Sequence, residues 1–371
     1  MNSIKKITAS VLAAVLAAGS MAYAADGYLE PYEYMDDIYK FDVGDFAEQA
    51  NAVTGEKQGK YYREGEIVSA FGFMDKESDG SFREEDNLTY TELAVAMLRI
   101  NSGKNTDMES RYSELEERTV PMSEAVGFAA STLGYDYLAK LRGMTVDEAA
   151  AKYGMLDGLG YIPEKYITRG EFARLVYNLL ELPMFVLDVS GKGGSFDDED
   201  TILERHDVIK IKGFLNGYQG VNVYAPKLMD KDSVYIDGVE YEYTTDTGAA
   251  ALGDNVLAYA VREDNAVIYL ESNNQKENIS FKLTDIENVS ETGISYTLSD
   301  GTAKRVSLSD LDYIVYNGVR ENNLSFLSAL SEEDGTVKIC RTEVNGRYNC
   351  VIVTKYDDFV TRATDSYEKI I

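Results

Sequence analysis

The stretch DKESDGSFREED, residues 75–86, places acidic side chains at the spacing of a calcium-binding loop. Asp75, Glu77 and Asp79 alternate with other residues, a glycine follows, and Asp86 takes the twelfth position. This spacing is close to the EF-hand pattern of oxygen ligands. An EF-hand prefers a bidentate Glu at that last position, and the Asp side chain is shorter. We therefore expect a structural turn first, with weak calcium binding as its candidate chemistry.

The same stretch leads into one of three similar segments, each expected to form an amphipathic helix. Each segment starts with an apolar residue, then has Thr or Pro, then Glu three places on, then apolar residues at helical spacing. The segments are Leu88–Ile100, Val120–Tyr135 and Ile167–Pro183, and the expected helix starts are Thr89 with Glu92, Pro121 with Glu124, and Thr168 with Glu171. The stretch before the third segment repeats the pattern without acids at ligand spacing, which favours the structural turn.

The first 24 residues have the pattern of a secretory signal peptide. Lys5 and Lys6 precede an uncharged, Ala-rich run that ends in the cleavage sequence Ala22-Tyr23-Ala24. A membrane anchor is the alternative, but the run is barely long enough to span a bilayer. We expect export, an extracellular location at the cell surface, and no membrane contact after the peptide is removed.

The charge of the chain excludes two classes of partner. There are 64 acidic and 36 basic side chains, a formal net charge of −28 at pH 7. Such a surplus of negative charge repels nucleic acid and anionic membranes. We therefore expect neither as a partner.

The chain changes near residue 190 from helical patterns to short alternating strands. We expect an α+β multidomain protein, with an all-α module followed by antiparallel all-β barrel or sandwich domains. The expected units are the signal peptide (1–24), an acidic Tyr-rich segment (25–59), the helical module (60–185), a Gly-rich acidic linker (186–201) and β domains at 202–275 and 276–371. Hairpin turns are predicted at Asp237-Gly238, Arg262–Asn265, Asp300-Gly301 and Val344–Gly346. The chain stops soon after the last hairpin, which leaves open that the second β domain continues in a longer protein.

The third segment and the residues before it, GYIPEKYITRGEFARLVYNLLELP, resemble the third repeat of a surface-layer homology (SLH) module. The preceding run, LGYDYLAKLRGM and then AAAKYGMLDG, resembles the form common in SLH proteins of Firmicutes. The resemblance covers about residues 60–183 and is strongest in the last repeat. It implies a three-part helical prism that holds an exported protein noncovalently on the cell wall. The implied partner is a secondary wall polysaccharide, often pyruvylated. Tyr90 and Met122 depart from the pattern, because they stand where the first two repeats would carry Arg, and the chain has no Trp.

The resemblance also implies that Arg169 binds the glycan. Its planar guanidinium can pair with a carboxylate through two parallel hydrogen bonds. Thr168 and Glu171 would orient it at a helix start, where free N–H groups favour anions. Tyr161 is the fourth residue that the resemblance implies for glycan binding. The alternative is that Arg169 lies on a solvated helix face.

Cys340 and Cys350 are the only cysteines, and they flank a predicted hairpin turn. A three-residue loop at Val344–Gly346 places them directly opposite each other, close enough for a disulfide. A two-residue Asn345-Gly346 turn would shift the register by one and point them to opposite faces. Export favours the disulfide, and the register decides between the two.

No recognised catalytic pattern accompanies these features. His206 is the only histidine, and the sequence has no identifiable Ser-His-Asp set, G-x-S-x-G motif or Cys/His metal spacing. We therefore expect a non-catalytic surface protein without a cofactor, with self-association as a further property. Two alternatives stay open. One is a self-assembling surface-layer protein, and the other is a polysaccharide-active enzyme whose chemistry lies in the β region or beyond the C-terminus.

Overall fold

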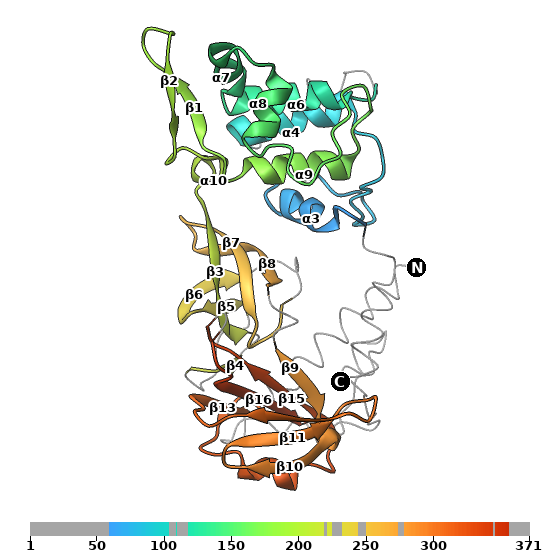
Figure 1. Cartoon of the computed structure of the whole chain (residues 1–371), viewed down its shortest axis with the longest axis vertical. Helices are drawn as coiled ribbons and strands as arrows, with labels where there is room; N and C mark the ends of the chain where they lie inside the picture. The colour runs from blue at the N-terminus through green and yellow to red at the C-terminus, as the bar shows by residue number, and fades with distance from the viewer. Residues whose placement is uncertain are drawn as a thin grey trace, which may run out of the picture.

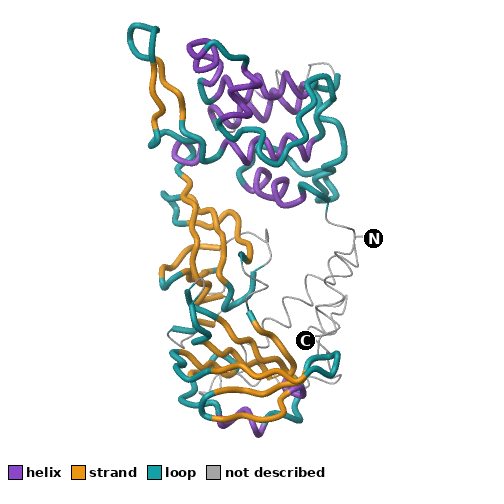
Figure 2. Tube along the Cα trace, viewed as in Figure 1, coloured by secondary structure: helices purple, strands orange, loops and turns teal. Residues whose placement is uncertain are grey.

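The computed structural model describes residues 59–103, 109, 118–218, 221–224, 232–243, 250–273, 278–343 and 346–355. Within these residues the chain is α+β, as predicted, with helices in the N-terminal part and several β-sheets in the C-terminal part (Figure 1, Figure 2). The predicted signal peptide, the acidic segment up to residue 58 and the end of the chain after residue 355 lie outside the described residues. Every helix among the described residues is too short or too polar to span a lipid bilayer.

The described part of the N-terminal module consists of short helices. They are α3 (Tyr62–Ala70), α4 (Tyr90–Ser102), α6 (Met122–Thr132), α7 (Tyr135–Arg142), α8 (Val146–Lys152) and α9 (Arg169–Leu179). The three predicted helix starts are confirmed, because α4 and α9 begin with complete capping boxes and Pro121 occupies the N-cap of α6. Thr145 and Glu148 form another capping box at α8, which the repeat pattern does not predict.

The segments that lead into α4, α6 and α9 join in a closed ring of backbone hydrogen bonds. The N–H of Leu88 donates to the C=O of Ile167 at 2.9 Å, Ile167 donates to Val120 at 3.0 Å, and Val120 donates to Leu88 at 3.0 Å. All three residues are completely buried. Each helix start is therefore bonded to both others, and the three segments form one cyclic unit, which we call the repeat ring.

A β-hairpin occupies the stretch that was expected to be a linker. β1 (Met184–Leu187) pairs with β2 (Gly194–Asp197), and the hairpin projects from the helical module (Figure 1). The ring of Phe196 packs against those of Phe185, Tyr135 and Tyr153, with centroid distances of 5.3 to 5.8 Å. These aromatic contacts hold to the module a segment whose glycines and acids alone favour an extended linker.

The first β unit follows α10 (Ile202–Arg205). Its strands are β3 (Val208–Tyr218), β4 (Val221–Asn222), β5 (Ser233–Ile236), β6 (Val239–Tyr243), β7 (Asn255–Val261) and β8 (Ala266–Ser272). The long strand β3 pairs with β7 over its first half and with β5 over its second. Because β5, β6, β8 and β7 are also paired in that order, the strand ladder returns to β3 around an apolar interior.

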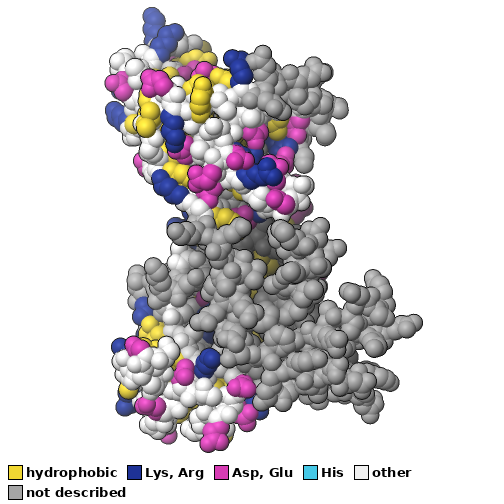
Figure 3. Space-filling model, turned by 90° about the vertical axis from the view of Figure 1, so that its right-hand side faces the viewer, with side chains coloured by type: hydrophobic (Ala, Val, Ile, Leu, Met, Phe, Trp, Pro, Cys, Tyr) yellow, Lys and Arg dark blue, Asp and Glu magenta, His cyan; other side chains and the backbone are white. Residues whose placement is uncertain are grey.

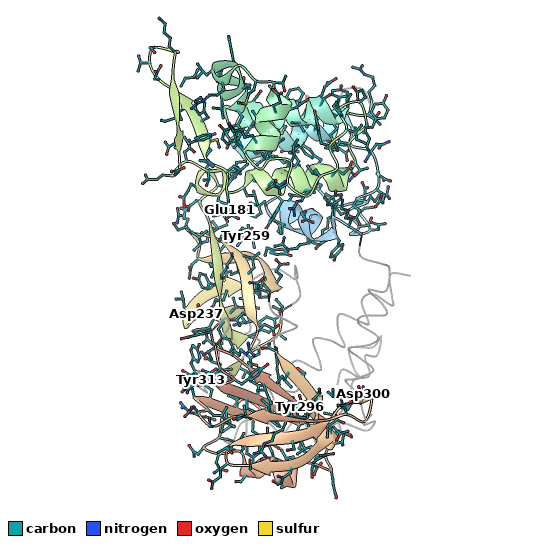
Figure 4. The ribbon with its side chains drawn as sticks, in the orientation of Figure 1. Glu181, Asp237, Tyr259, Tyr296, Asp300 and Tyr313 are labelled. Carbon is teal, nitrogen blue, oxygen red and sulfur yellow. The ribbon has the colours of Figure 1, made fainter. Side chains whose placement is uncertain are left out.

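The helical module and the first β unit share one hydrophobic core. Tyr259 and Tyr269 from β7 and β8 belong to the same buried cluster as the apolar residues of the helices. The ring of Phe71 meets that of Tyr259 at 5.2 Å, and Arg63 pairs with Glu271 at 2.6 Å. Figure 4 shows Tyr259 where the two units meet. The two units are therefore packed together directly.

The second β unit has two sheets on either side of its own core. The strands are β9 (Ile279–Lys282), β10 (Ile286–Ser290), β11 (Gly293–Thr297), β12 (Ala303–Ser307), β13 (Tyr313–Tyr316), β14 (Val319–Arg320), β15 (Gly335–Cys340) and β16 (Cys350–Lys355), with short 3₁₀ turns η2 (Leu283–Asp285) and η3 (Ser325–Ala329). One sheet has the order β14-β13-β16-β15-β9 and the other β10-β11-β12. Apolar residues from both sheets and from the 3₁₀ turns form the core between them.

Two strand pairs differ from the predicted antiparallel arrangement. β6 and β8 run parallel, with Glu242 opposite Ala266, and β13 and β16 run parallel, with Tyr313 opposite Cys350. In each unit an intervening strand, β7 or β15, returns the chain to the starting end. Hairpin signals describe only neighbouring strands, so they do not predict these crossovers.

Candidate glycan-binding site

The repeat ring carries a group of aromatic and charged side chains on its outer surface. The hydroxyl of Tyr90 donates to Oε2 of Glu124 at 2.6 Å, and the guanidinium carbon of Arg118 lies 5.3 Å from the centre of the Tyr90 ring. Tyr166 is 51% exposed, and its backbone bridges to Pro121. We call Tyr90, Arg118, Glu124 and Tyr166 the ring face.

Backbone hydrogen bonds of the repeat ring position these side chains. The N–H of Tyr90 donates to the C=O of Arg118 at 3.0 Å, and the N–H of Met122 donates to the C=O of Lys165 at 2.8 Å. Residues from all three segments therefore meet on one surface. The hydrogen bond to Glu124 raises the pKa of the Tyr90 hydroxyl above its ordinary value, which keeps that hydroxyl protonated.

The ring face has the chemistry to hold a sugar. Aromatic rings pack against the C–H faces of sugar rings, and a hydroxyl, a carboxylate and a guanidinium offer donors and acceptors to sugar hydroxyls. Acidic and basic side chains are interspersed over the helical module (Figure 3). Arg118 is exposed and lies over the ring of Tyr90.

Arg169 lies inside the module rather than on the ring face, and its side chain is only 7% exposed. Its Nε donates to the C=O of Phe82 at 2.9 Å, its Nη2 donates to the C=O of Asp75 at 2.8 Å, and its Nη1 pairs with the carboxylate of Glu92. The prediction that Arg169 presents an open fork to a glycan carboxylate does not hold, because the first repeat supplies these acceptors. The alternative of a solvated helix face fails for the same reason.

The other residues predicted to bind the glycan have structural roles. Thr168 and Glu171 cap the start of α9, and Tyr161 packs against the core. Oγ1 of Thr168 accepts the N–H of Glu171 at 3.2 Å, and the Glu171 carboxylate accepts the N–H of Thr168 at 3.1 Å and Nζ of Lys165 at 2.6 Å. Tyr161 packs against the core of the module. Burial, together with the nearby carboxylate of Asp147, raises the pKa of the Tyr161 hydroxyl. Thr168 and Glu171 therefore form the helix start at Arg169, and Tyr161 packs against the core, so these residues do not form an open site.

The acidic residues of the candidate calcium loop do not converge on one point. They are Asp75, Glu77, Asp79 and Asp86. Asp75 pairs with Arg99 at 2.9 Å, and Asp79 accepts hydrogen bonds from the N–H and hydroxyl of Ser81. The carbonyl of Glu77 accepts the N–H of Gly80, which closes a turn. Among the described residues, no group of three or more His, Cys, Asp or Glu side chains is placed to hold a metal ion. The loop is built as a turn, as its structural interpretation predicts.

Cys340 and Cys350 are directly opposite each other at the ends of β15 and β16. Their predicted opposite placement is therefore confirmed. The predicted three-residue loop does not account for it, because β15 already ends at Cys340, β16 begins only at Cys350, and Val344 and Asn345 lie outside the described residues. Both residues are completely buried, and both are free thiols in this structure, so the predicted disulfide is not formed in it. A hydrogen bond to Cys340 and burial together raise the pKa of the Cys350 thiol.

His206 connects α10 to the helical module. Its Nε2 lies 2.8 Å from the carbonyl oxygen of Ile100, and its ring meets that of Phe73 edge to face at 4.8 Å. These contacts give His206 a structural role between α10 and the helical module.

Sequence reasoning missed the ring face and the Arg63–Glu271 pair at the junction. One signal for the ring face was available, since Tyr90 occupies in the first repeat the position that Arg169 occupies in the third. No sequence signal links Arg63 to Glu271, because the two lie far apart in the chain.

The chain was also compared with known proteins. No family model matches it, and neither a curated protein nor a solved structure gives a significant match.

Proposed function

We propose that this chain is a non-catalytic, exported surface protein that attaches noncovalently to a cell-wall polysaccharide through an SLH-like helical module. In this proposal the first β unit is a small barrel and the second a sandwich, and both are spacers that extend from the wall. The ring face is the observation that carries the proposal. It gathers aromatic, basic and acidic side chains from three segments on one surface.

The ring face replaces Arg169 as the proposed glycan contact. Tyr166 and Tyr90 would pack against sugar rings, while Arg118 would attract an acidic substituent of the polymer. The overall negative charge of the chain opposes a polyanion, and salt screens that repulsion beyond about 10 Å. Binding is therefore expected to depend on short-range contacts at the ring face.

Co-sedimentation of the mature chain with cell-wall sacculi tests the proposal. One batch of sacculi keeps its secondary polysaccharide, and the other has it stripped by acid. We expect pelleting only with the intact batch. The mature chain is used whole, because the helical module shares its core with Tyr259 and Tyr269 of the first β unit.

A pair of matched variants tests the site. Tyr166→Ala should weaken pelleting about tenfold or more, the loss of roughly 1.4 kcal/mol that a central aromatic contact commonly supplies. Tyr137 on α7 has nearly the same exposure, 50% against 51%, so Tyr137→Ala is the control and should leave pelleting unchanged. Equal pelleting of both variants would remove the ring face from the proposal.

The same co-sedimentation experiment distinguishes wall attachment from the alternative of a self-assembling surface-layer protein. Pelleting with neither batch would reject wall attachment. If the protein then forms concentration-dependent assemblies in analytical ultracentrifugation, the self-assembling surface-layer function takes its place.

A further inference from the structure

The two β units meet around the two cysteines. The cluster at this contact consists of Phe214 and Val223 from the first unit and Val315, Cys340, Cys350 and Ile352 from the second. The rings of Tyr224 and Tyr313 add a contact at 4.8 Å, and Figure 4 shows Tyr313 at this junction. The sulfur atoms are therefore part of the interface between the two units.

A glycine of the first unit closes over the sulfur of Cys340. Gly253 has φ +85°, and a Cβ built there would lie 2.6 Å from Sγ of Cys340 and 2.7 Å from Cδ1 of Ile352. The neighbouring Asp254 pairs with Lys338 of β15 at 2.7 Å, which fixes this loop against the second unit. The docked first unit therefore covers the thiols, and both cysteines are completely buried.

We propose that Cys340 and Cys350 form a disulfide in the exported protein, and that this bond forms before the two β units dock. Residues directly opposite in an antiparallel pair have Cα atoms roughly 4.5 or 5.5 Å apart. Both spacings lie within the disulfide range of about 4.4–6.8 Å. Directly opposite side chains of an antiparallel pair also point to the same face of the sheet, so the two thiols face the same side. A disulfide here needs no change of strand register.

The proposed order of events follows from whether an oxidant can reach the two sulfur atoms. A thiolate must attack the disulfide of an oxidant, and the sulfurs must be reachable for that attack. In the docked protein the Gly253 loop covers Cys340, and burial raises the pKa of Cys350. Both conditions are unfavourable for oxidation after docking. The reaction therefore takes place after β15 and β16 have paired and before the first unit has docked on them.

The reaction is a thiol–disulfide exchange with an external disulfide oxidant. One cysteine thiolate attacks that oxidant, forms a mixed disulfide and releases one thiol of the oxidant. The second cysteine then attacks the protein sulfur of the mixed disulfide and releases the other thiol. The protein loses two protons and two electrons, and the oxidant is reduced to two thiols.

This inference rests on the proposed function only through export, because disulfides persist outside the cytosol. Its test is performed on purified protein and does not involve the cell wall. A failure of wall pelleting and a failure of disulfide formation are therefore separate results.

The experiment refolds the reduced mature chain from denaturant, with oxidised glutathione as the probe, and compares it with native reduced protein given the same reagent. Free thiols are then alkylated in denaturant, and intact mass is measured. We expect the refolded sample to be unalkylated and two hydrogens lighter than the reduced chain. The native sample should still take two alkyl groups over the same time.

Stability provides a second readout. The oxidised protein should unfold at a higher temperature than the reduced one, by on the order of 10 °C for the second β unit. The double variant Cys340→Ala with Cys350→Ala should show no difference between oxidising and reducing conditions. Two alkyl groups on the refolded protein would overturn the disulfide. Oxidation of native protein as fast as refolding protein would overturn the order of events.

Discussion

Replacing Arg169 with methionine should destabilise the helical module. The carbonyl oxygens of Asp75 and Phe82 and the carboxylate of Glu92 would all lose the guanidinium that they bind. Methionine retains an apolar stem that can pack against Phe82, whose ring lies 5.0 Å from the guanidinium. Hydrogen bonds to charged groups contribute about 1.5–3 kcal/mol each, and breaking a buried ion pair from one side costs about 3–5 kcal/mol. Glu92 is 30% exposed, so water can partly replace its partner. We therefore expect a loss of about 3 kcal/mol in the free energy of unfolding.

Urea unfolding of the mature chain, followed by far-UV circular dichroism, measures this loss. The control is Arg142→Met, which removes an exposed arginine from the end of α7 and should change stability by less than about 1 kcal/mol. Wall pelleting is measured on the same samples. An Arg169→Met protein with unchanged stability and lost pelleting would refute the structural role and restore Arg169 as a glycan contact.

Two further predictions concern close packing and pH. Gly253→Ala should lower the unfolding temperature of the β units, since the added methyl group would meet Cys340 at 2.6 Å and the residue has φ +85°. The expected cost is about 1–3 kcal/mol, and an unchanged unfolding temperature would contradict the close approach. Burial raises the pKa of Tyr135 to about 12, so the folded state favours its neutral form, and this stability is present below about pH 10 and lost as the pH rises toward 12. Tyr135→Phe should reduce the alkaline loss of stability by at most about 2–3 kcal/mol. Unfolding curves recorded between about pH 10 and pH 12 measure this difference. An equal loss of stability in both proteins would contradict the prediction.

Local patterns predicted the helix starts and several turns because each depends on a few neighbouring residues. The Thr89–Glu92 capping box forms as expected. Asp237 and Gly238 form the predicted hairpin turn with φ values of +50° and +82°, which is why an Asp-Gly pair marks such turns. Cys340 and Cys350 are opposite each other as predicted, but a longer connection than the predicted three-residue loop joins their strands, so the local turn rule does not explain the placement.

The candidate site and the contacts between units depend on residues distant in the chain, and local patterns do not contain them. Arg169 has the sequence context of a surface residue, but the loop of the first repeat encloses it. The stretch expected to be a linker is held by Phe196, which packs against Tyr135 and Tyr153 of the module. The ring face likewise requires that segments 30 or more residues apart meet, as Tyr90 and Glu124 do at a separation of 34 residues.

The repeat ring has a consequence for how this module can evolve. Repeats stacked end to end can be added or removed, because each contacts only its neighbours. The repeat ring has no free end, since the amides of Leu88, Val120 and Ile167 each bond to the carbonyl of another member. Duplicating or deleting one repeat would break this closure and leave buried donors and acceptors without partners. A change in the number of repeats in this chain would therefore require a new closure of the ring.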